Sequence, residues 1–220
     1  MWSPATIAAE DTARVVVMGS AEIRVAPDLA FVTIAMESRN ENPRVAQQEN
    51  AKTSDAVLAK LTSAGIEKKA IRTVSYGLNE EFDYDKGKRR SRGYLARNQI
   101  EIRLGKIEKV GETIDLAIGA GATSVSGLRF DVKNRDELER QALEEAVADG
   151  RARAQAAATG AGSDIGSLLV IEQDGLSAPP PPGPVFRGAV AMAADAGAAP
   201  PIQAGEIEIS ARVRVTAELQ

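Results

Sequence analysis

The 220-residue sequence has the composition of an ordinary globular protein, with neither cysteine nor histidine. Hydrophobic residues make up 44% of the chain and charged residues 26%, and the formal net charge is -4. The two missing residue types exclude disulfides, thiolate and imidazole metal ligands, and catalytic triads whose base is histidine. The small net charge gives no general attraction to nucleic acid. We therefore expect no cofactor, no metal and no nucleic-acid partner.

The sequence predicts a short N-terminal segment followed by one domain. Residues 1–13 lack the basic and apolar regions of a signal peptide, and we expect them to form a flexible N-terminal segment. Residues 14–220 are expected to form a single domain. No apolar run in them is long enough to predict a transmembrane segment.

Alternation of apolar and polar residues predicts the strands. It is clearest over residues 206–219, and it recurs over residues 94–104. Further strands are predicted at residues 15–25, 29–38, 71–82, 125–132 and 168–173. One apolar and one polar face is typical of antiparallel sheets. The turn residues Ala26, Pro27 and Asp28 predict that the first two strands form a hairpin.

Capping residues and helical spacing predict three helices. Their spans are residues 43–64, 107–120 and 135–160. Asn42 followed by Pro43 is a favoured start for the first helix, and Asn134 with Glu137 resembles a capping box at the start of the third. The first two helices end in Ala-Gly, and glycine is the usual residue after a helix end. The third helix is rich in alanine, which allows close packing against a neighbour.

The element order β-β-α-β-β-α-β-α-β-β predicts an α+β fold. We expect a mostly antiparallel sheet with helices packed on one face. A strand, a helix ending in Ala-Gly and a second strand occur twice, which indicates a duplicated βαβ-like module. Residues 176–204 contain a proline run and an Ala/Gly-rich tract, and we expect an irregular insert there, either functional or a mobile excursion.

The densest basic run is the main candidate interaction site. Acidic residues precede it, and a turn is predicted at residues 85–87. The candidate residues are Lys86, Lys88, Arg89, Arg90 and Arg92, with Tyr84 and Tyr94. They could bind an anionic glycan, lipid or small molecule, or they could form a solvated hairpin tip. Tyr76, Phe82, Tyr84 and Tyr94 could likewise form an apolar or sugar-binding platform, or pack across the hairpin.

Two other patterns point to structure more than to chemistry. Residues 119–124 are glycine-rich, but they lack the lysine of a phosphate loop and follow a helix, which favours a helix-ending turn. The carboxylate pairs Asp83/Asp85 and Glu144/Glu145 lack the frame of a calcium loop, which favours solvated acids. We therefore expect no enzymatic activity.

The ordered set of motifs resembles the SIMPL-domain family. Its opening signature is matched by residues 17–19 and 25–30, and its helix-to-strand segment by residues 64–66 and 71–73. The remaining matches, in the family's order, are Phe82-Asp83-Tyr84, Gly93-Tyr94, Ala120-Gly121-Ala122, Phe130 and Gly205 with residues 213–215. The resemblance implies a sheet-plus-helices fold, export to the bacterial periplasm, a loose link to stress responses and ring-like self-assembly. It implies no catalytic residues.

Two functions follow as expectations. The preferred one is a non-catalytic envelope protein that acts through self-assembly or protein interaction, as a homo-oligomer whose apolar contacts come from residues 185–186 and 190–192. The alternative is a ligand-binding module that uses the basic and aromatic hairpin over residues 76–94.

Overall fold

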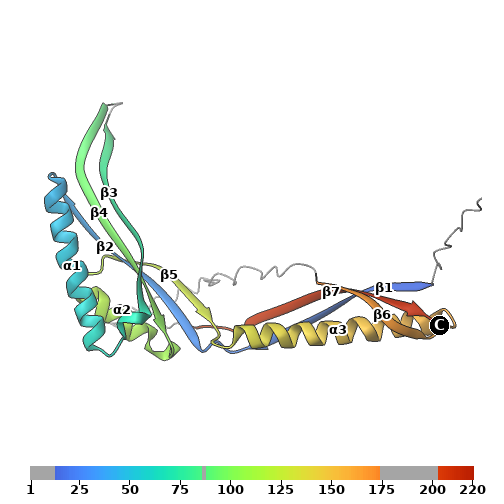
Figure 1. The fold of residues 1–220 in the computed structure, drawn as a ribbon. Coiled ribbons are helices and arrows are strands. Elements are labelled where there is room, and N and C mark those ends of the chain that lie inside the picture. The colour runs from blue at the N-terminus through green and yellow to red at the C-terminus, as the bar shows by residue number, and fades with distance from the viewer. Residues whose placement is uncertain (1–12, 86–87, 174–202) are drawn as a thin grey trace, which may run out of the picture. The chain divides into compact units, whose positions relative to one another are not determined.

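The computed structural model describes residues 13–85, 88–173 and 203–220. The chain folds into two compact units, which we treat separately. The first unit contains β1, α3, β6 and β7, and the second contains the elements from β2 to β5 (Figure 1). The fold is α+β and its strands pair antiparallel, as predicted, but they form two sheets where one was expected; the order of helices and strands is also confirmed.

The second unit is a four-stranded sheet with two helices on one face (Figure 1). Its elements are β2 (Leu29–Asn40), α1 (Pro43–Ser63), β3 (Ile71–Asp85), β4 (Lys88–Leu104), α2 (Val110–Gly119) and β5 (Ser124–Asp131). Short 3-10 turns at Lys68–Ala70 and Ile107–Lys109 precede β3 and α2. The strand order β3-β4-β2-β5, with antiparallel neighbours, is that of two interleaved split βαβ units, the ferredoxin-like arrangement. The βαβ-like units expected from the sequence are therefore present.

The core of the second unit lies between the helices and the middle strands. The fully buried side chains include Ile34 and Met36 of β2, Ile100 and Ile102 of β4, and Leu61 of α1. Asn50 of α1 is buried among them, and its amide donates to the carbonyls of Met36 at 2.7 Å and Ala96 at 3.1 Å. One helical side chain thus holds α1 over both β2 and β4.

The helices end as their glycines predict. Gly65 and Gly121 have φ of 88° and 111°, and the next residue donates to a carbonyl five positions back in each case. This is the Schellman pattern, in which a left-handed residue lets the last carbonyls of the helix be satisfied. The glycine-rich residues 119–121 are therefore a helix end, as the sequence favoured.

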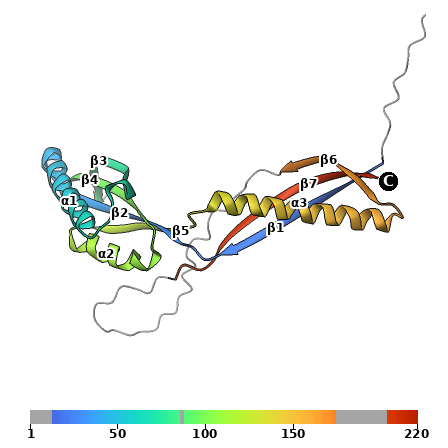
Figure 2. The ribbon, with the colours of Figure 1, turned by 60° about the horizontal axis from the view of Figure 1, so that its bottom comes forward.

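The first unit consists of a three-stranded sheet and one long helix. Its elements are β1 (Arg14–Val25), α3 (Arg135–Gly160), β6 (Ile165–Gln173) and β7 (Ile207–Leu219), with strand order β1-β7-β6. The alternation predicted for the last strand is confirmed, since its apolar residues from Ile207 to Ala217 are all buried. Helix α3 runs alongside β1 and β7 (Figure 2).

Small residues let α3 approach the sheet very closely. The buried positions of α3 repeat every four residues along one stripe: Ala142, Ala146, Gly150, Ala154 and Ala158. A Cβ on Gly19 of β1 would lie 2.1 Å from the Ala146 carbonyl oxygen, and a Cβ on Gly150 would lie 2.6 Å from Val215 Cγ2. A methyl group has no space at either position, because the α3 backbone fills it at Gly19 and the buried Val215 side chain fills it at Gly150.

A carboxylate of α3 also accepts a hydrogen bond from the edge strand of the same sheet. Asp149 accepts a hydrogen bond from the Ser20 backbone N–H at 2.9 Å and pairs with Arg153 at 2.8 Å. The hydrogen bond from Ser20, helped by that from Arg153, holds the pKa of the Asp149 carboxyl below its usual value. Because β1 is an edge strand, Asp149 satisfies an amide that no neighbouring strand reaches.

Two expectations from the sequence are wrong. Strands β1 and β2 do not form a hairpin, because they belong to different sheets. The segment between them instead joins β2 to the end of β5: Asp28 N–H donates to the Asp131 carbonyl, and Asp28 Oδ1 accepts from the Lys133 N–H. Asn134 does not cap α3 with its side chain either, and only its backbone carbonyl accepts from Glu137 and Leu138.

Most of two predicted segments lies outside the part of the chain that the structure describes. Residues 1–12 of the predicted flexible segment and residues 176–202 of the predicted insert lie outside the described residues. The apolar stretches at residues 185–186 and 190–192 lie there too. Folding of residues 14–220 as one domain stays a prediction, beside the two compact units of the structure.

The close packing of α3 predicts opposite effects for two glycines of the same helix. Gly150→Ala should lower the free energy of unfolding by about 1–3 kcal/mol, because the new methyl overlaps Val215. Gly160→Ala is the matched control, since its methyl meets no atom within 4 Å and should be neutral or stabilising by up to about 1 kcal/mol. Urea denaturation measures both. Equal effects would show that α3 does not approach the sheet this closely.

Candidate functional site

The hairpin of β3 and β4 extends past the rest of its sheet (Figure 1). β2 pairs with β4 only as far as Asn40 opposite Tyr94, so the hairpin beyond Tyr94 is a two-stranded ribbon. A register shift between Glu81 and Phe82 leaves Arg92 without a partner in the ladder, and Gly93 has φ of 88°. A bulge with a left-handed glycine therefore lies where the ribbon leaves the sheet.

The ribbon carries most of the predicted interaction residues, but they do not form one basic cluster. Arg92 pairs with Asp83 at 3.3 Å, and Arg89 lies 3.3 Å above the Phe82 ring. Arg90 is exposed opposite Asp83. Lys88 begins β4, and Lys86 lies outside the described residues. The acidic residues thus neutralise part of the positive charge.

The predicted aromatic residues do not lie directly opposite one another in the hairpin. In the register, Tyr76 faces Asn98, Phe82 faces Ser91 and Tyr84 faces Arg89. Tyr94 faces Glu80. The partners are polar, and Phe82 is covered by a guanidinium instead of a ring. The register therefore contains no directly opposed pair of these aromatic residues, and packing of the rings across the hairpin stays a prediction.

Instead, the apolar residues of β3 form a row along the edge of the sheet. Residues paired across an antiparallel ladder point to the same face. Tyr76 and Leu78 pair with Asn98 and Ala96, and Ala96 is buried under α1. Tyr76 is 52% exposed and Leu78 is 36% exposed, although both are on the face that carries the helices. They are exposed because α1 packs mainly on β2 and β4.

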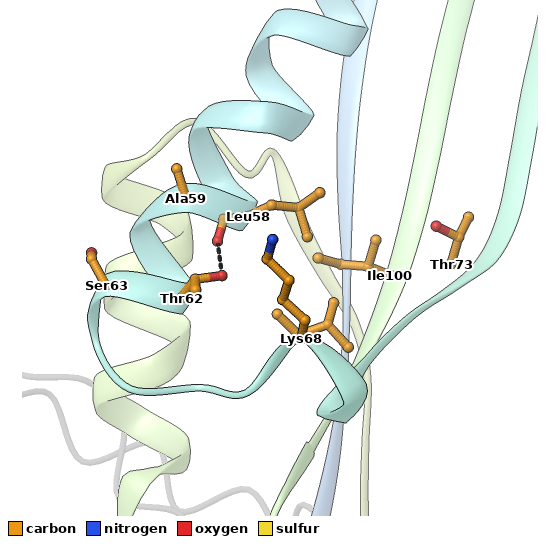
Figure 3. A pocket seen from close by; sticks show the side chains of 8 residues that line it. Leu58, Ala59, Thr62, Ser63, Lys68, Thr73 and Ile100 are labelled. Atoms are coloured by element: carbon orange, nitrogen blue, oxygen red, sulfur yellow. Dashed lines mark hydrogen bonds between the residues drawn. The ribbon is translucent and has the colours of Figure 1, made fainter.

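A groove lies between α1 and the start of β3. Its volume is about 760 Å³, and it is lined by Leu58, Ala59, Thr62, Ser63, Lys68, Ile71, Thr73 and Ile100. Leu58 and Ile100 form apolar walls on two sides, and Lys68 extends its amine between them (Figure 3). Lys69 pairs with Glu67 at 2.7 Å, whereas Lys68 has no ion pair within the described residues.

Sequence patterns alone do not single out this groove. They place Leu58 on the inward face of its helix and Ile71 on a strand. Neither the helical spacing nor the strand alternation shows that the two residues lie together beside an uncovered sheet edge. The one available signal is the composition of residues 73–79, which are uncharged although they belong to an edge strand. Edge strands usually carry charges or proline.

The site offers surfaces for binding. Within the described ranges, no three acidic, histidine or cysteine side chains gather where they could hold a metal ion. None of the helices in those ranges is long and apolar enough to cross a membrane. What the site does provide is an open strand edge, an apolar groove and one cation without an ion pair among the described residues.

The comparisons define the class of protein. Residues 15–217 match the SIMPL family, described as a protein of unknown function (DUF541), and the chain belongs to this family. The resemblance seen in the sequence motifs is confirmed.

The chain is similar to a protein named periplasmic and to uncharacterised proteins. It is 27% identical over 215 residues to the 26 kDa periplasmic immunogenic protein of Brucella melitensis, covering 94% of this chain and 85% of that protein. It is 23% identical over 161 residues to the uncharacterized protein YggE of Escherichia coli K12, covering 73% and 65%. To YggE of Edwardsiella ictaluri it is 22% identical over 206 residues, covering 93% and 86%.

Two glycines with equal φ test the bulge where the ribbon leaves the sheet. Gly93 and Gly65 both have φ of 88°, but a Cβ on Gly93 would lie 2.7 Å from the Asn40 carbonyl oxygen, whereas one on Gly65 meets nothing within 4 Å. Gly65→Ala should cost about 1–2 kcal/mol of unfolding free energy, from backbone strain alone. Gly93→Ala should cost about 1–3 kcal/mol more. Chemical denaturation that gives equal losses would contradict the close contact.

Proposed function

We propose that this chain is a non-catalytic periplasmic protein that acts through contacts with other proteins, first of all with further copies of itself. The observation that carries the proposal is the exposed apolar edge of the first unit's sheet. Leu169, Val170 and Ile171 of β6 are 49%, 45% and 48% exposed, and they are consecutive on an edge strand. An exposed, apolar strand edge is a template for pairing with another chain.

The contrast with the opposite edge supports this assignment. On β1, Asp149 of α3 already accepts from the Ser20 amide, so a helix protects part of that edge. Within the described residues, no side chain is hydrogen-bonded to the β6 backbone in a similar way. Within the described residues, β6 therefore has less of its edge protected than β1 has, and it is the edge that we assign to a partner strand.

The compartment is part of the proposal. Support comes from the Brucella relative, whose name calls it periplasmic. A stress-related role stays a prediction. The alternative of an anion-binding hairpin also stays a prediction, and it is weakened by the pairing of Arg92 with Asp83 and the position of Arg89 on Phe82.

Light scattering of the full chain at micromolar concentration tests the association. We expect a mass that is a multiple of 23.2 kDa. Val170→Lys places a charge in the apolar edge and should weaken association at least tenfold. Val16→Lys is the matched control, because Val16 is a 54% exposed valine on β1, the edge strand whose Ser20 amide already bonds to Asp149, and association should be unchanged.

Two results would overturn the proposal. One is a mass near 23.2 kDa that does not change on tenfold concentration. The other is an equal effect of Val170→Lys and Val16→Lys, which would show that the β6 edge has no special part in association.

A further inference from the structure

The edge strand β3 and the groove beside it form a second surface that is distinct from β6. We propose that this surface binds an extended polypeptide segment, which pairs with β3 as a fifth strand antiparallel to it and places a carboxylate beside Lys68. The proposal shares with the proposed function only the need for a protein partner, and it concerns the other unit of the chain.

The backbone of β3 can accept a further strand. The order β3-β4-β2-β5 leaves one side of β3 without a strand neighbour in the described structure. Residues 73–79 contain neither proline nor a charged side chain, two of the usual means by which an edge is protected, although the register with β4 shifts once, between Thr73 and Ser75. Outward amides and carbonyls of this stretch would supply the main-chain hydrogen bonds of strand addition.

The side chains around β3 provide places for the alternate residues of such a strand. In strand addition, the side chains on one face of the added strand enter pockets of the receiving protein. Here the face toward α1 presents the groove at Ile71 and Thr73, followed by the exposed Tyr76 and Leu78. A volume of about 760 Å³ is that of a site for one short segment or small molecule. Large apolar side chains at alternate positions would therefore fit.

Lys68 fixes the direction and the charge of the ligand. Its amine extends into the groove beside Leu58 and has no ion pair in the described ranges (Figure 3). Lys68 lies in the turn directly before β3 begins at Ile71. A strand antiparallel to β3 has its C-terminal end at that point, so either a terminal carboxylate or an acidic side chain near it would meet the ammonium group.

A defined peptide probe tests the proposal on the full chain. The probe is a fluorescein-labelled octapeptide that alternates leucine and threonine and ends in a free carboxylate. Fluorescence anisotropy should show saturable binding. The same peptide with a C-terminal amide should bind about 3–10-fold more weakly, and methylation of alternate backbone nitrogens should abolish binding because it prevents strand pairing.

Variants of the protein locate the binding. Ala59→Phe fills the groove and should weaken binding at least tenfold, whereas Ala51→Phe, at an exposed position two turns earlier on α1, should not. Lys68→Gln should weaken binding of the carboxylate peptide about 3–10-fold and leave the amide peptide unaffected. Lys69→Gln is the matched control, because Lys69 pairs with Glu67 and does not line this groove.

Each contrary outcome is distinct. Equal binding of the N-methylated peptide, or no effect of Ala59→Phe, would overturn strand addition at β3. The proposal would also be overturned if dodecanoate, and not the peptide, bound saturably and Lys68→Gln weakened that binding. This result would show that the groove binds a fatty acid. Circular dichroism checks that the Ala59→Phe variant folds. If that variant does not fold, Lys68→Gln, a substitution at the surface, still decides whether the peptide binds in the groove. If the peptide does not bind but self-association is still weakened by Val170→Lys, this inference fails and the proposed function stands.

Discussion

The width of a helix limits how much of the second unit's sheet can be covered. An α-helix with its side chains is about 10 Å across, and neighbouring strands are about 4.8 Å apart, so one helix covers roughly two strands. Helix α1 covers β2 and β4, and Asn50 holds it there through hydrogen bonds to Met36 and Ala96. Strand β3 lies outside this cover. Because the helix is too narrow to cover β3, Tyr76 and Leu78 are exposed and a groove is left beside the start of this strand.

The two units handle their strand edges in different ways. In the first unit the glycine and alanine stripe lets α3 lie so close to β1 that Asp149 reaches the Ser20 amide. The edge at β6 has no such contact in the described structure, and neither does the edge at β3. The apolar residues of both open edges are exposed on strands that also offer unpaired backbone groups. Association and peptide binding are therefore proposed at two separate edges of one chain.

The sequence predicted local structure well because the signals for it are local. Alternation in β7 reflects burial of every second residue, and Gly65 and Gly121 end their helices through a left-handed conformation. Pairing between distant strands has no such signal. The turn residues at Pro27 and Asp28 indicated a change of direction, but they could not show that β1 pairs with β7, far along the chain. Gly19 is needed by a contact with α3 that only the tertiary structure reveals.

The site was harder to predict than the fold for the same reason. Charge density pointed to Arg89 and Arg92, whose side chains the structure places on Phe82 and Asp83. Lys68, one residue among many lysines in sequence, gains its significance only from its position between Leu58 and Ile100.

Amide hydrogen exchange of the free protein tests most directly the central claim that the edge of β3 is uncovered. Outward amides of residues 73–79 should exchange much faster than those of β2 and β4, and protection equal to that of β2 would show that the β3 edge is already covered.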